Sequence, residues 1–211
     1  MEIRTKLCNR ANYGGRRTGP IGYLVIHYTS NLGDTAKNNA DYFARETVGA
    51  SAHYFVDESE VWQSVPDDSI AWHCGAKQYF HPACRNANSI GIEICMQDKQ
   101  GGLRQASIDR AAQLTRMLMQ EYSIPAGRVV RHYDVTHKNC PAPMVEDPAL
   151  WAAFKAKLEV KTVSNDNTPA AWAKDAWDKV TAAGVMDGAR PTEPVTRQEL
   201  AVILDRLGLV T

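Results

Sequence analysis

The chain has 211 residues with 24 basic and 24 acidic side chains, so its formal net charge is zero. Proteins that bind nucleic acid through its phosphates normally carry a basic face, and the balanced charge argues against that class of partner. The apolar stretch "IGYLVI" is too short to cross a bilayer, so we expect no membrane span. The opening residues, "MEIRTKLCNR", lack the apolar region of a secretory signal.

Strands and helices are predicted in alternation along the first half of the chain. "GYLVIHYTSN" is typical of a buried strand that ends in polar residues, and Asp34 is expected to cap a helix over residues 35–46. "SAHYFVD" and "EVWQSV" predict two short strands joined by a tight hairpin at "ESE". Residues 66–88 predict a long surface loop, and loops of that length are usually functional.

The next segment predicts one more strand with two distinct faces. "SIGIEIC" alternates, placing Ile90, Ile92 and Ile94 on one face and Gly91, Glu93 and Cys95 on the other. Ser107 is expected to cap a long amphipathic helix, and "RVVRHYD" to form a short strand that ends near His132. Asp147 and Pro148 predict the start of a further helix. Interleaved strands and helices indicate an α/β domain, a central mixed β-sheet flanked by helices, over residues 1–160.

The remaining residues predict a linker and a small second unit. Residues 161–168 are polar and bounded by proline, which is typical of a linker. Residues 169–211 predict a small helical unit. Its tryptophans, Trp172 and Trp177, cannot share one narrow helical stripe. We therefore expect one of them to pack inward and the other to meet a partner.

A candidate metal site lies in "RHYDVTHKNCP", which contains His132, His137 and Cys140. A closed structural zinc site takes four protein ligands, whereas a catalytic site takes three and leaves one position open. His27 ends the first buried strand, so its ring can reach over the end of the sheet. His27, His132 and Cys140 then form a three-ligand set of imidazoles and thiolate, which suits zinc. His137 is a rival ligand, and a buried core histidine is the alternative for His27.

The chain has five cysteines, Cys8, Cys74, Cys84, Cys95 and Cys140. An odd number without a visible signal segment is not typical of a secreted disulfide framework. A disulfide between Cys74 and Cys84 stays open, since spacing alone does not set its geometry. A second metal at His81 and Cys84 is a further alternative.

Five motifs together carry a resemblance to a known family. "VIHYT", "SAHYFVD", "AWHCG", "SIGIE" and "RHYDVTHKNCP", in this order, resemble the zinc-dependent N-acetylmuramoyl-L-alanine amidases over roughly residues 20–155. This family shares its fold with peptidoglycan recognition proteins and many phage endolysins. The resemblance implies that amidase fold, one zinc ion per chain at His27, His132 and Cys140, and peptidoglycan as substrate. The implied reaction is hydrolysis of the amide between N-acetylmuramic acid and L-alanine.

The resemblance also implies roles for individual residues. Glu93 occupies the position of the acid that activates water, and Lys138 that of the transition-state stabiliser. Ala52 stands where some relatives have a catalytic tyrosine, which fits the subgroup that relies on the glutamate. An acid on a strand flanked by isoleucines is costly to bury unless something requires it. The alternatives are a salt-bridged carboxylate at Glu93 and a solvated loop lysine at Lys138.

Three other residues are expected to line the groove or to contact substrate: His53, Trp72 and His73. The last 43 residues, 169–211, resemble one S-layer-homology segment, a unit that elsewhere anchors proteins to cell-wall polymers. A cell-wall polymer is therefore an expected partner of this unit, with oligomerisation or a simple helical cap as alternatives. The oligomeric state stays open.

Two classes of function follow. The first is an enzyme, a phage or prophage endolysin that stays in the host cytoplasm until its release and then acts on the cell wall; a bacterial autolysin in wall turnover is the alternative enzyme. The second is a non-catalytic peptidoglycan-binding module. Such modules commonly lose the cysteine ligand, so the presence of Cys140 and Glu93 favours the enzyme.

Overall fold

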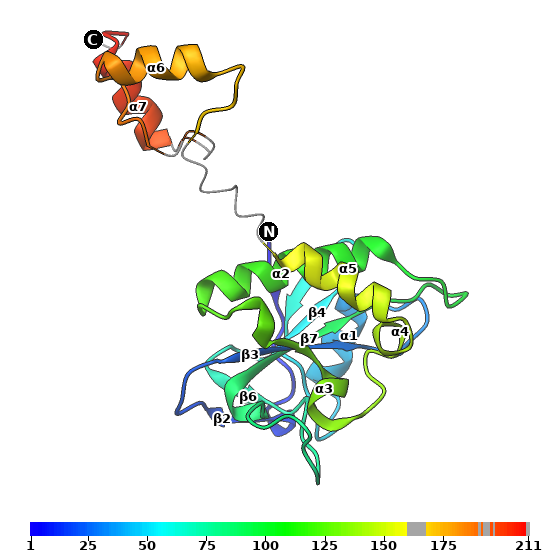
Figure 1. Ribbon diagram of the computed structural model, residues 1–211. Helices are drawn as coiled ribbons and strands as arrows, with labels where there is room; N and C mark the ends of the chain where they lie inside the picture. The colour runs from blue at the N-terminus through cyan, green and yellow to red at the C-terminus, as the bar shows by residue number, and fades with distance from the viewer. Residues whose placement is uncertain (160–167, 190, 192–194, 196, 210–211) are drawn as a thin grey trace. The chain divides into compact units, whose positions relative to one another are not determined.

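The computed structural model describes residues 1–159, 168–189, 191, 195 and 197–209 (Figure 1). The chain divides into two compact units, unit 1 (Met1–Glu159) and unit 2 (Val160–Thr211). This division lies beside the boundary expected at residue 160. The predicted linker, residues 161–168, falls outside the described residues except for its last position.

Unit 1 is built on a mixed six-stranded sheet in the order β1-β5-β4-β7-β3-β8. β5 pairs antiparallel with β4, and the other neighbours are parallel. A separate antiparallel pair joins β2 to β6. The strands are β1 (Arg4–Thr5), β2 (Tyr13–Arg16), β3 (Tyr23–Tyr28), β4 (Tyr54–Val56), β5 (Val61–Gln63), β6 (Ser69–Ala71), β7 (Ser89–Ile94) and β8 (Val129–Arg131).

The helices of unit 1 cover the sheet in two layers, as Figure 1 shows. They are α1 (Ala36–Arg45), α2 (Gln105–Glu121), α3 (His132–Thr136), α4 (Ala142–Glu146) and α5 (Pro148–Leu158), with single 3₁₀ turns at Arg10–Asn12, Asn86–Asn88 and Ala126–Arg128. α2 and α5 lie together on one face of the sheet, and α3 and the β2–β6 pair lie on the opposite side. The sequence therefore predicted the α/β class and the mixed sheet correctly.

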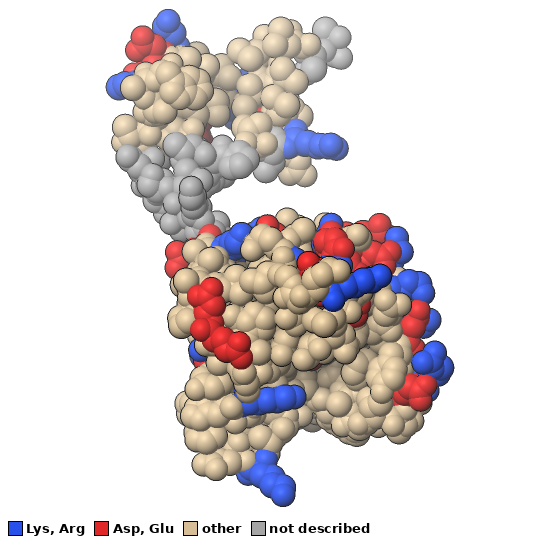
Figure 2. All heavy atoms as spheres, turned by 90° about the vertical axis from the view of Figure 1, so that its right-hand side faces the viewer, with Lys and Arg blue, Asp and Glu red and all other residues tan. Residues whose placement is uncertain are grey.

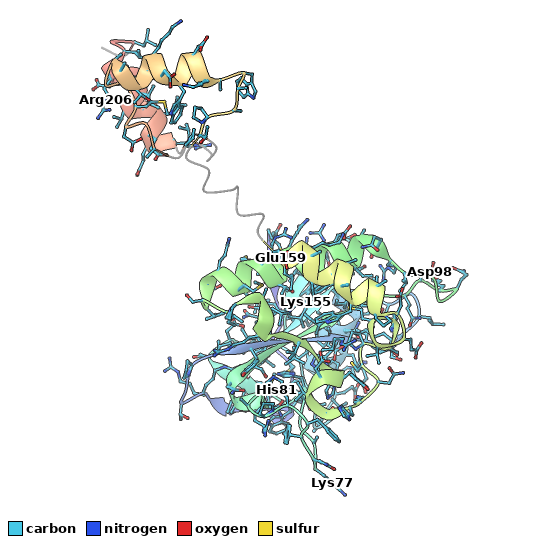
Figure 3. All side chains as sticks on the ribbon, viewed as in Figure 1. Lys77, His81, Asp98, Lys155, Glu159 and Arg206 are labelled. Carbon is cyan, nitrogen blue, oxygen red and sulfur yellow. The ribbon has the colours of Figure 1, made fainter. Side chains whose placement is uncertain are left out.

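The main core lies between the sheet and the α2–α5 layer. The alternation in β7 is as predicted, because Ile90, Ile92 and Ile94 are all fully buried in this core. Leu24 and Ile26 of β3 join them from the neighbouring strand. Lys155 of α5, labelled in Figure 3, donates a hydrogen bond of 2.9 Å to the carbonyl of Val129 and another to Ala126. The opposite face of the same strands is left free to carry polar side chains.

Three local predictions were wrong. The cap of α1 is Thr35, whose hydroxyl accepts from the amide of Asn38, rather than Asp34. α2 begins at Gln105, before the expected cap Ser107, which is buried within the first turn. The predicted loop 66–88 contains β6, because Ser69–Ala71 pairs with β2 from a remote part of the chain, a partnership that the local polar sequence conceals.

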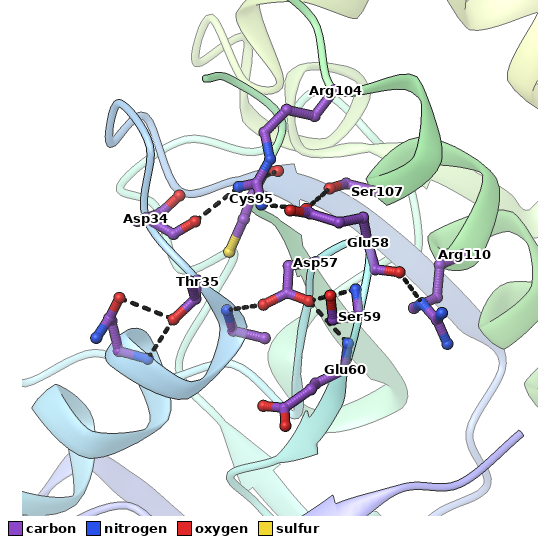
Figure 4. A network of polar contacts seen from close by, with 12 residues as sticks. Asp34, Thr35, Asp57, Glu58, Ser59, Glu60, Cys95, Arg104, Ser107 and Arg110 are labelled. Atoms are coloured by element: carbon purple, nitrogen blue, oxygen red, sulfur yellow. Dashed lines mark hydrogen bonds and ion pairs between the residues drawn. The ribbon is translucent and has the colours of Figure 1, made fainter. Parts of the chain in front are cut away.

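A network of polar contacts fixes the segment before α1 against the sheet (Figure 4). Asp57, only 3% exposed, accepts hydrogen bonds from the backbone amides of Ala36, Ser59 and Glu60. Arg104 donates to the carbonyl of Asp34 at 2.6 Å and also pairs with Glu58. The loop that contains Asp34 is therefore held from two sides, by the hairpin and by the start of α2.

The described residues of unit 2 form two helices, α6 (Lys174–Ala182) and α7 (Arg197–Arg206). Arg206, labelled in Figure 3, donates to the carbonyls of Gly184 and Val185, both at 3.1 Å, and so ties α7 to the end of α6. Trp172 lies before α6 and is 91% exposed, whereas Trp177 lines a pocket of about 430 Å³ between the helices. Trp177 is thus partly buried and Trp172 faces outward, and contact of a tryptophan with a partner stays a prediction.

Two further features of the structure concern surface charge and helix length. Basic and acidic side chains lie side by side on the face of unit 1 that Figure 2 displays, in keeping with the zero net charge of the whole sequence. Among the described residues, no helix combines the length and the apolar character needed to span a membrane.

Candidate metal centre and active site

The register between two neighbouring strands brings the first two residues of the site together. β3 and β7 run parallel, and His27 is directly opposite Glu93 in their pairing. Each follows an isoleucine of the main core, so the side chains of both residues point to the opposite face of the sheet. Nδ1 of His27 lies 3.9 Å from Oε1 of Glu93. The period of two in each strand therefore brings an imidazole and a carboxylate together.

His132 and Cys140 reach the same place from the next strand. Ile26 is paired with Arg131, the last residue of β8, so the following residue, His132, lies beside His27 with 4.6 Å between ring centroids. The sequence placed His132 at the end of this strand; it is in fact the first residue of α3. After α3 the chain turns back, and the amide of Tyr133 donates to the carbonyl of Cys140 at 2.8 Å.

His27, His132 and Cys140 form a compact buried group that could hold a metal ion. Their ligand atoms all lie within 4.8 Å of one another, and the three residues are between 1% and 6% exposed. Tetrahedral zinc bonds of about 2.0 Å to nitrogen and about 2.3 Å to sulfur separate the two atoms by about 3.5 Å. Sγ of Cys140 and Nδ1 of His27 are 3.7 Å apart.

The hydrogen bonding of the group also fits a bound cation. Nδ1 of His132 is buried and has no hydrogen-bond partner among the described residues. A buried polar atom without a partner is unfavourable, and a metal ion in the group is a partner that would remove this cost. Two imidazoles and a thiolate are donors that suit zinc.

Burial sets the protonation of the metal-free group. Burial, and after it the neighbouring His132, holds the pKa of His27 well below its usual range. Burial and then Lys138 lower the pKa of His132 to about 4. Both imidazoles are therefore neutral near pH 7, which is the form that binds a metal. Burial and the carboxylate of Glu93 raise the pKa of Cys140 to about 12, so binding a metal must release the thiol proton.

Glu93 lies beside the metal group, where its carboxylate can act on a molecule bound to the metal. Its side chain is 22% exposed, while its Oε2 atom is buried and has no hydrogen-bond partner among the described residues. Burial raises the pKa of Glu93 to about 8, with Lys138 opposing this rise and Asp34 adding to it. Glu93 and Lys138 were predicted as the catalytic pair, and both line one pocket together with Cys140, while their catalytic roles stay predictions.

Two pockets border the metal group. One, of about 780 Å³, is lined by Glu93, Lys138 and Cys140 together with Tyr28 and Asp34. The other, of about 550 Å³, is lined by Lys138 and His132 and by the loop that carries Trp72 and His73. This arrangement suits a substrate whose reacting bond lies in the middle and whose two parts extend to either side.

The rival metal ligands lie elsewhere. His137 is exposed and stacks on Phe80, with ring centroids 3.6 Å apart, and it is not a member of the metal group. His81, labelled in Figure 3, uses Nδ1 to accept from the amides of Ala83 and Cys84. Among the described residues no second group of metal ligands includes His81 or Cys84.

The cysteines outside the metal group are free thiols. Cys74 and Cys84 are both fully buried in one apolar cluster, and the disulfide left open by the sequence is not formed. The Cys84 thiol hydrogen-bonds to Cys74, which lowers the pKa of Cys74 and raises that of Cys84.

The three predicted substrate-binding residues occupy different depths. Trp72 is 38% exposed and lines the smaller pocket, so its contact with substrate stays a prediction. His53 is 0% exposed, and its Nδ1 accepts from the amide of Gly91, a position that does not fit direct contact with substrate. His73 lines the smaller pocket, but its ring also contacts the metal group from behind, with 3.0 Å between its Nδ1 and Nε2 of His27.

The contact between His73 and His27, and the residue that supports His73, were not predicted from the sequence. Sequence reasoning singled out His73 through "AWHCG" but not its bond to His27, because the two residues are far apart in the sequence. It also missed Ser89, whose hydroxyl lies 3.2 Å from Nε2 of His73. The only signal was the isolated serine at the start of the strand "SIGIEIC".

Comparisons with known proteins agree with this architecture. The family model of N-acetylmuramoyl-L-alanine amidases matches residues 17–143, more than half of the chain. N-acetylmuramoyl-L-alanine amidase CwlL of Bacillus licheniformis is 34% identical over 169 residues, which are 74% of this chain and 47% of CwlL. N-acetylmuramoyl-L-alanine amidase BlyA of Bacillus subtilis (strain 168) is 34% identical over 166 residues, 72% of this chain and 45% of BlyA. The chain thus spans about half the length of the curated relatives it matches.

Solved structures give the same result for the fold. PlyL superposes with a TM-score of 0.65 at 32% identity, over 77% of this chain and 100% of PlyL. The catalytic domain of XlyA superposes with a TM-score of 0.64 at 28% identity, over 75% of this chain and 99% of that domain. Since the family model matches more than half of the chain, the chain belongs to the N-acetylmuramoyl-L-alanine amidase family.

Proposed function

We propose that this chain hydrolyses the amide bond between N-acetylmuramic acid and L-alanine in bacterial peptidoglycan, with one zinc ion at His27, His132 and Cys140. The observation that carries the proposal is the buried metal group with Glu93 beside it and a pocket on each side. The names of the relatives CwlL and BlyA support the choice of bond. When bound, a zinc ion supplies a Lewis acid that polarises the carbonyl and acidifies water.

Glu93 is the general base and then the general acid. Its unpaired Oε2 accepts a proton from the attacking water, and the same oxygen delivers that proton to the nitrogen of the departing L-alanine. Burial raises the pKa of the carboxyl to about 8 in the metal-free protein, and a cation bound beside it would lower that pKa, so that Glu93 could both accept and return a proton near neutral pH. Glu93 is thus suited to carry one proton through both halves of the reaction.

Lys138 stabilises the charge that develops on the carbonyl oxygen. It lines both pockets, so its ammonium is available to the bond that crosses between them. A positive charge that strengthens its interaction as the oxygen becomes anionic lowers the barrier rather than the affinity. Its closeness to the group is also evident electrostatically, because Lys138 lowers the pKa of Glu93, of His132 and of Cys140.

Mass spectrometry of digested cell walls tests the reaction directly. Purified peptidoglycan treated with the chain and zinc should release stem peptides with a free N-terminal L-alanine and leave glycan strands with a free lactyl carboxyl. The Glu93→Gln protein at the same zinc occupancy is the matched control and should release neither. Cleavage at a glycosidic bond, or between two amino acids of the stem, would contradict the proposed bond.

A non-catalytic peptidoglycan-binding module is the second candidate. The larger pocket would serve a binder as well as an enzyme. However, binding alone gives no reason for a buried carboxylate oxygen without a partner beside the ligand group, since such an atom costs stability. Binding to walls without release of soluble products, by protein with one zinc bound, would favour this candidate.

We further propose that the chain is a phage or prophage endolysin that acts on the cell wall after release from the host cytoplasm. Residues 169–211 would then bind a cell-wall polymer or join copies of the chain. The outward Trp172 and the pocket beside Trp177 support a contact surface on unit 2. Fractionation of host cells before and after lysis tests the location, and sedimentation of the purified chain tests the oligomeric state.

A further inference from the structure

A chain of hydrogen bonds runs from a backbone carbonyl to His27. The Ser89 hydroxyl donates to the carbonyl of Arg85 at 2.7 Å. Ser89 Oγ lies 3.2 Å from Nε2 of His73, and Nδ1 of His73 lies 3.0 Å from Nε2 of His27. The other nitrogen of His27, Nδ1, faces Cys140 and Glu93. The hydrogen-bonded series therefore ends at Nε2 of His27, the ring nitrogen opposite the one that faces the metal group.

Each bond in this chain determines the next. A carbonyl only accepts, so Ser89 must spend its single hydrogen on Arg85 and can only accept from His73. Nε2 of His73 therefore carries a hydrogen, and in a neutral ring its Nδ1 is then a bare acceptor. That acceptor requires a hydrogen on Nε2 of His27, which leaves Nδ1 of His27 bare. A bare nitrogen is what a metal ligand needs.

The fold holds the His73 ring in place for this task. A Cβ atom at Gly91 would lie 2.6 Å from Cγ of His73, so the ring packs directly on the bare backbone of β7. The side-chain oxygen of Asn86 accepts from the amides of both His73 and Cys74, at 3.2 and 2.8 Å. Ser89 itself is 0% exposed. Ring and backbone are thus both fixed, although one edge of His73 lines a pocket.

We propose that His73 is a positioning residue, anchored by Ser89, that fixes His27 in the tautomer with Nδ1 bare and aimed at the metal. This inference rests on the proposed zinc site and adds a residue that acts through a ligand. In the other tautomer, the hydrogen on Nδ1 would occupy the side that faces Cys140, and the ring would have to exchange tautomers before binding. A fixed tautomer removes that cost and also fixes the orientation of the ring.

Nuclear magnetic resonance of the metal-free full chain tests the tautomer without any reference to activity. Long-range proton–nitrogen correlations of ¹⁵N-labelled histidine distinguish the two neutral tautomers. We expect both His27 and His73 with hydrogen on Nε2. In Ser89→Ala, which keeps the His73 ring but removes its anchor, we expect signals of both tautomers at His73. A wild-type His27 with hydrogen on Nδ1 would overturn the inference.

Zinc affinity, measured by competition with a chelator at fixed pH, tests the consequence. His73→Phe should weaken binding about 10- to 100-fold, the usual effect of losing a partner that orients a metal-bound histidine. His73→Asn returns an acceptor near the position of Nδ1 and should recover most of the loss. His137→Phe makes the same change at an exposed, stacked ring and should leave the affinity unchanged.

The two tests separate this inference from the proposed function. Equal zinc affinity in wild type, His73→Phe and His73→Asn, all shown to be folded by circular dichroism, would contradict the positioning role even if the enzyme is active. A wild-type chain that binds no zinc would instead contradict the proposed metal, and the tautomer of His27 in the metal-free spectra would then decide the inference alone.

Discussion

Glu93 combines a buried, unpaired carboxylate oxygen with a place beside the metal ligands. Glu93→Gln changes one oxygen to an amide nitrogen of similar size, so fold and metal binding should persist. The amide cannot take a proton from water, and general-base assistance is typically worth about 10²- to 10⁴-fold. We therefore expect turnover on muropeptides to fall by about that factor, measured as product released per zinc-loaded chain.

The zinc content of the Glu93→Gln protein is the control for this experiment. A variant with full zinc and nearly normal turnover would remove Glu93 from the mechanism. A variant without zinc would show instead that the carboxylate supports the ligand group, to which it lies close at His27.

Cys140 is the only ligand in the group with a soft sulfur donor. Cys140→Ser replaces it with a hydroxyl, which binds zinc weakly and resists deprotonation at neutral pH. We expect this variant to lose most of its zinc to a mild chelator, as measured by metal analysis after gel filtration. His137→Ala is the matched control from the same loop and should keep its zinc. The opposite pattern, with zinc kept in Cys140→Ser and lost in His137→Ala, would show that the ligand set is wrong.

At the scale of elements, β7 must remain free of a side chain at Gly91. An added methyl group there meets the His73 ring at 2.6 Å, and Asn86 and Ser89 prevent the ring from retreating. Overpacking of this kind typically costs about 1–3 kcal/mol. Gly91→Ala should therefore lower the free energy of unfolding in urea by about that amount. Gly15→Ala, also in a strand but with nothing within 4 Å of the new atom, should have little effect.

Asp41 of α1 pairs with Lys6, which follows β1, and with Lys37 of the same helix. Hydrogen bonds from Lys37 and then Lys6 lower the pKa of Asp41 to about 2. A depressed carboxyl pKa stabilises the fold above the unfolded value of about 3.9, and this contribution disappears as the pH falls through the folded value. Asp41→Asn should thus melt below the wild type at pH 7, and the gap should narrow between pH 4 and pH 2.

The salt dependence of the difference in melting temperature between Asp41→Asn and the wild type tests whether it arises from charge. Lys6, Lys37 and Asp41 all reach solvent, so added salt should reduce the gap at pH 7 by screening. A gap that is independent of both pH and salt would mean that Asn disturbs the packing of α1 rather than the charge.

Most strands and helices of unit 1 follow from local sequence patterns, whereas β6 and the first residue of α1 do not. The period-two alternation of "SIGIEIC" predicts both the buried face of β7 and the polar face that carries Glu93. β6 was missed because it has only three residues and its strand partner, β2, is more than fifty residues earlier. The cap of α1 was placed one residue early, since Asp34 and Thr35 are both good capping residues and only tertiary contacts decide between them.

The residues of the candidate site that lie at or next to the ends of strands could be predicted from the sequence. His27 and His132 follow from the ends of neighbouring strands, and Cys140 follows from the loop after them. The depth of His53 and the contact between His73 and His27 were not predictable, because both depend on a loop that returns across the sheet. Local sequence shows that such a loop is polar but not which face of the sheet it covers.

At the scale of the whole molecule, the two units differ in how much they bury. Unit 1 has a continuous core of strands and helices with nineteen fully or nearly fully buried apolar residues. Within the described part of unit 2, Val185 is the only buried residue, at 9% exposed, and Leu200 and Val202 of α7 remain half exposed. The superposition on the solved PlyL chain covers 77% of this chain and 100% of that one.

This difference leads to a prediction about the division of labour. A chain that ends at Glu159 keeps every residue assigned to the metal group and both pockets around it, since none of these comes from unit 2. It should therefore fold, bind one zinc ion and cleave soluble muropeptide fragments at nearly the rate of the full chain. It should bind intact walls less well, or differ in oligomeric state, because the outward Trp172 and the pocket at Trp177 are gone. Turnover on soluble fragments, wall pull-down and sedimentation measure the three properties separately. A truncated protein that is folded and zinc-loaded but inactive on soluble fragments would show that unit 2 takes part in catalysis.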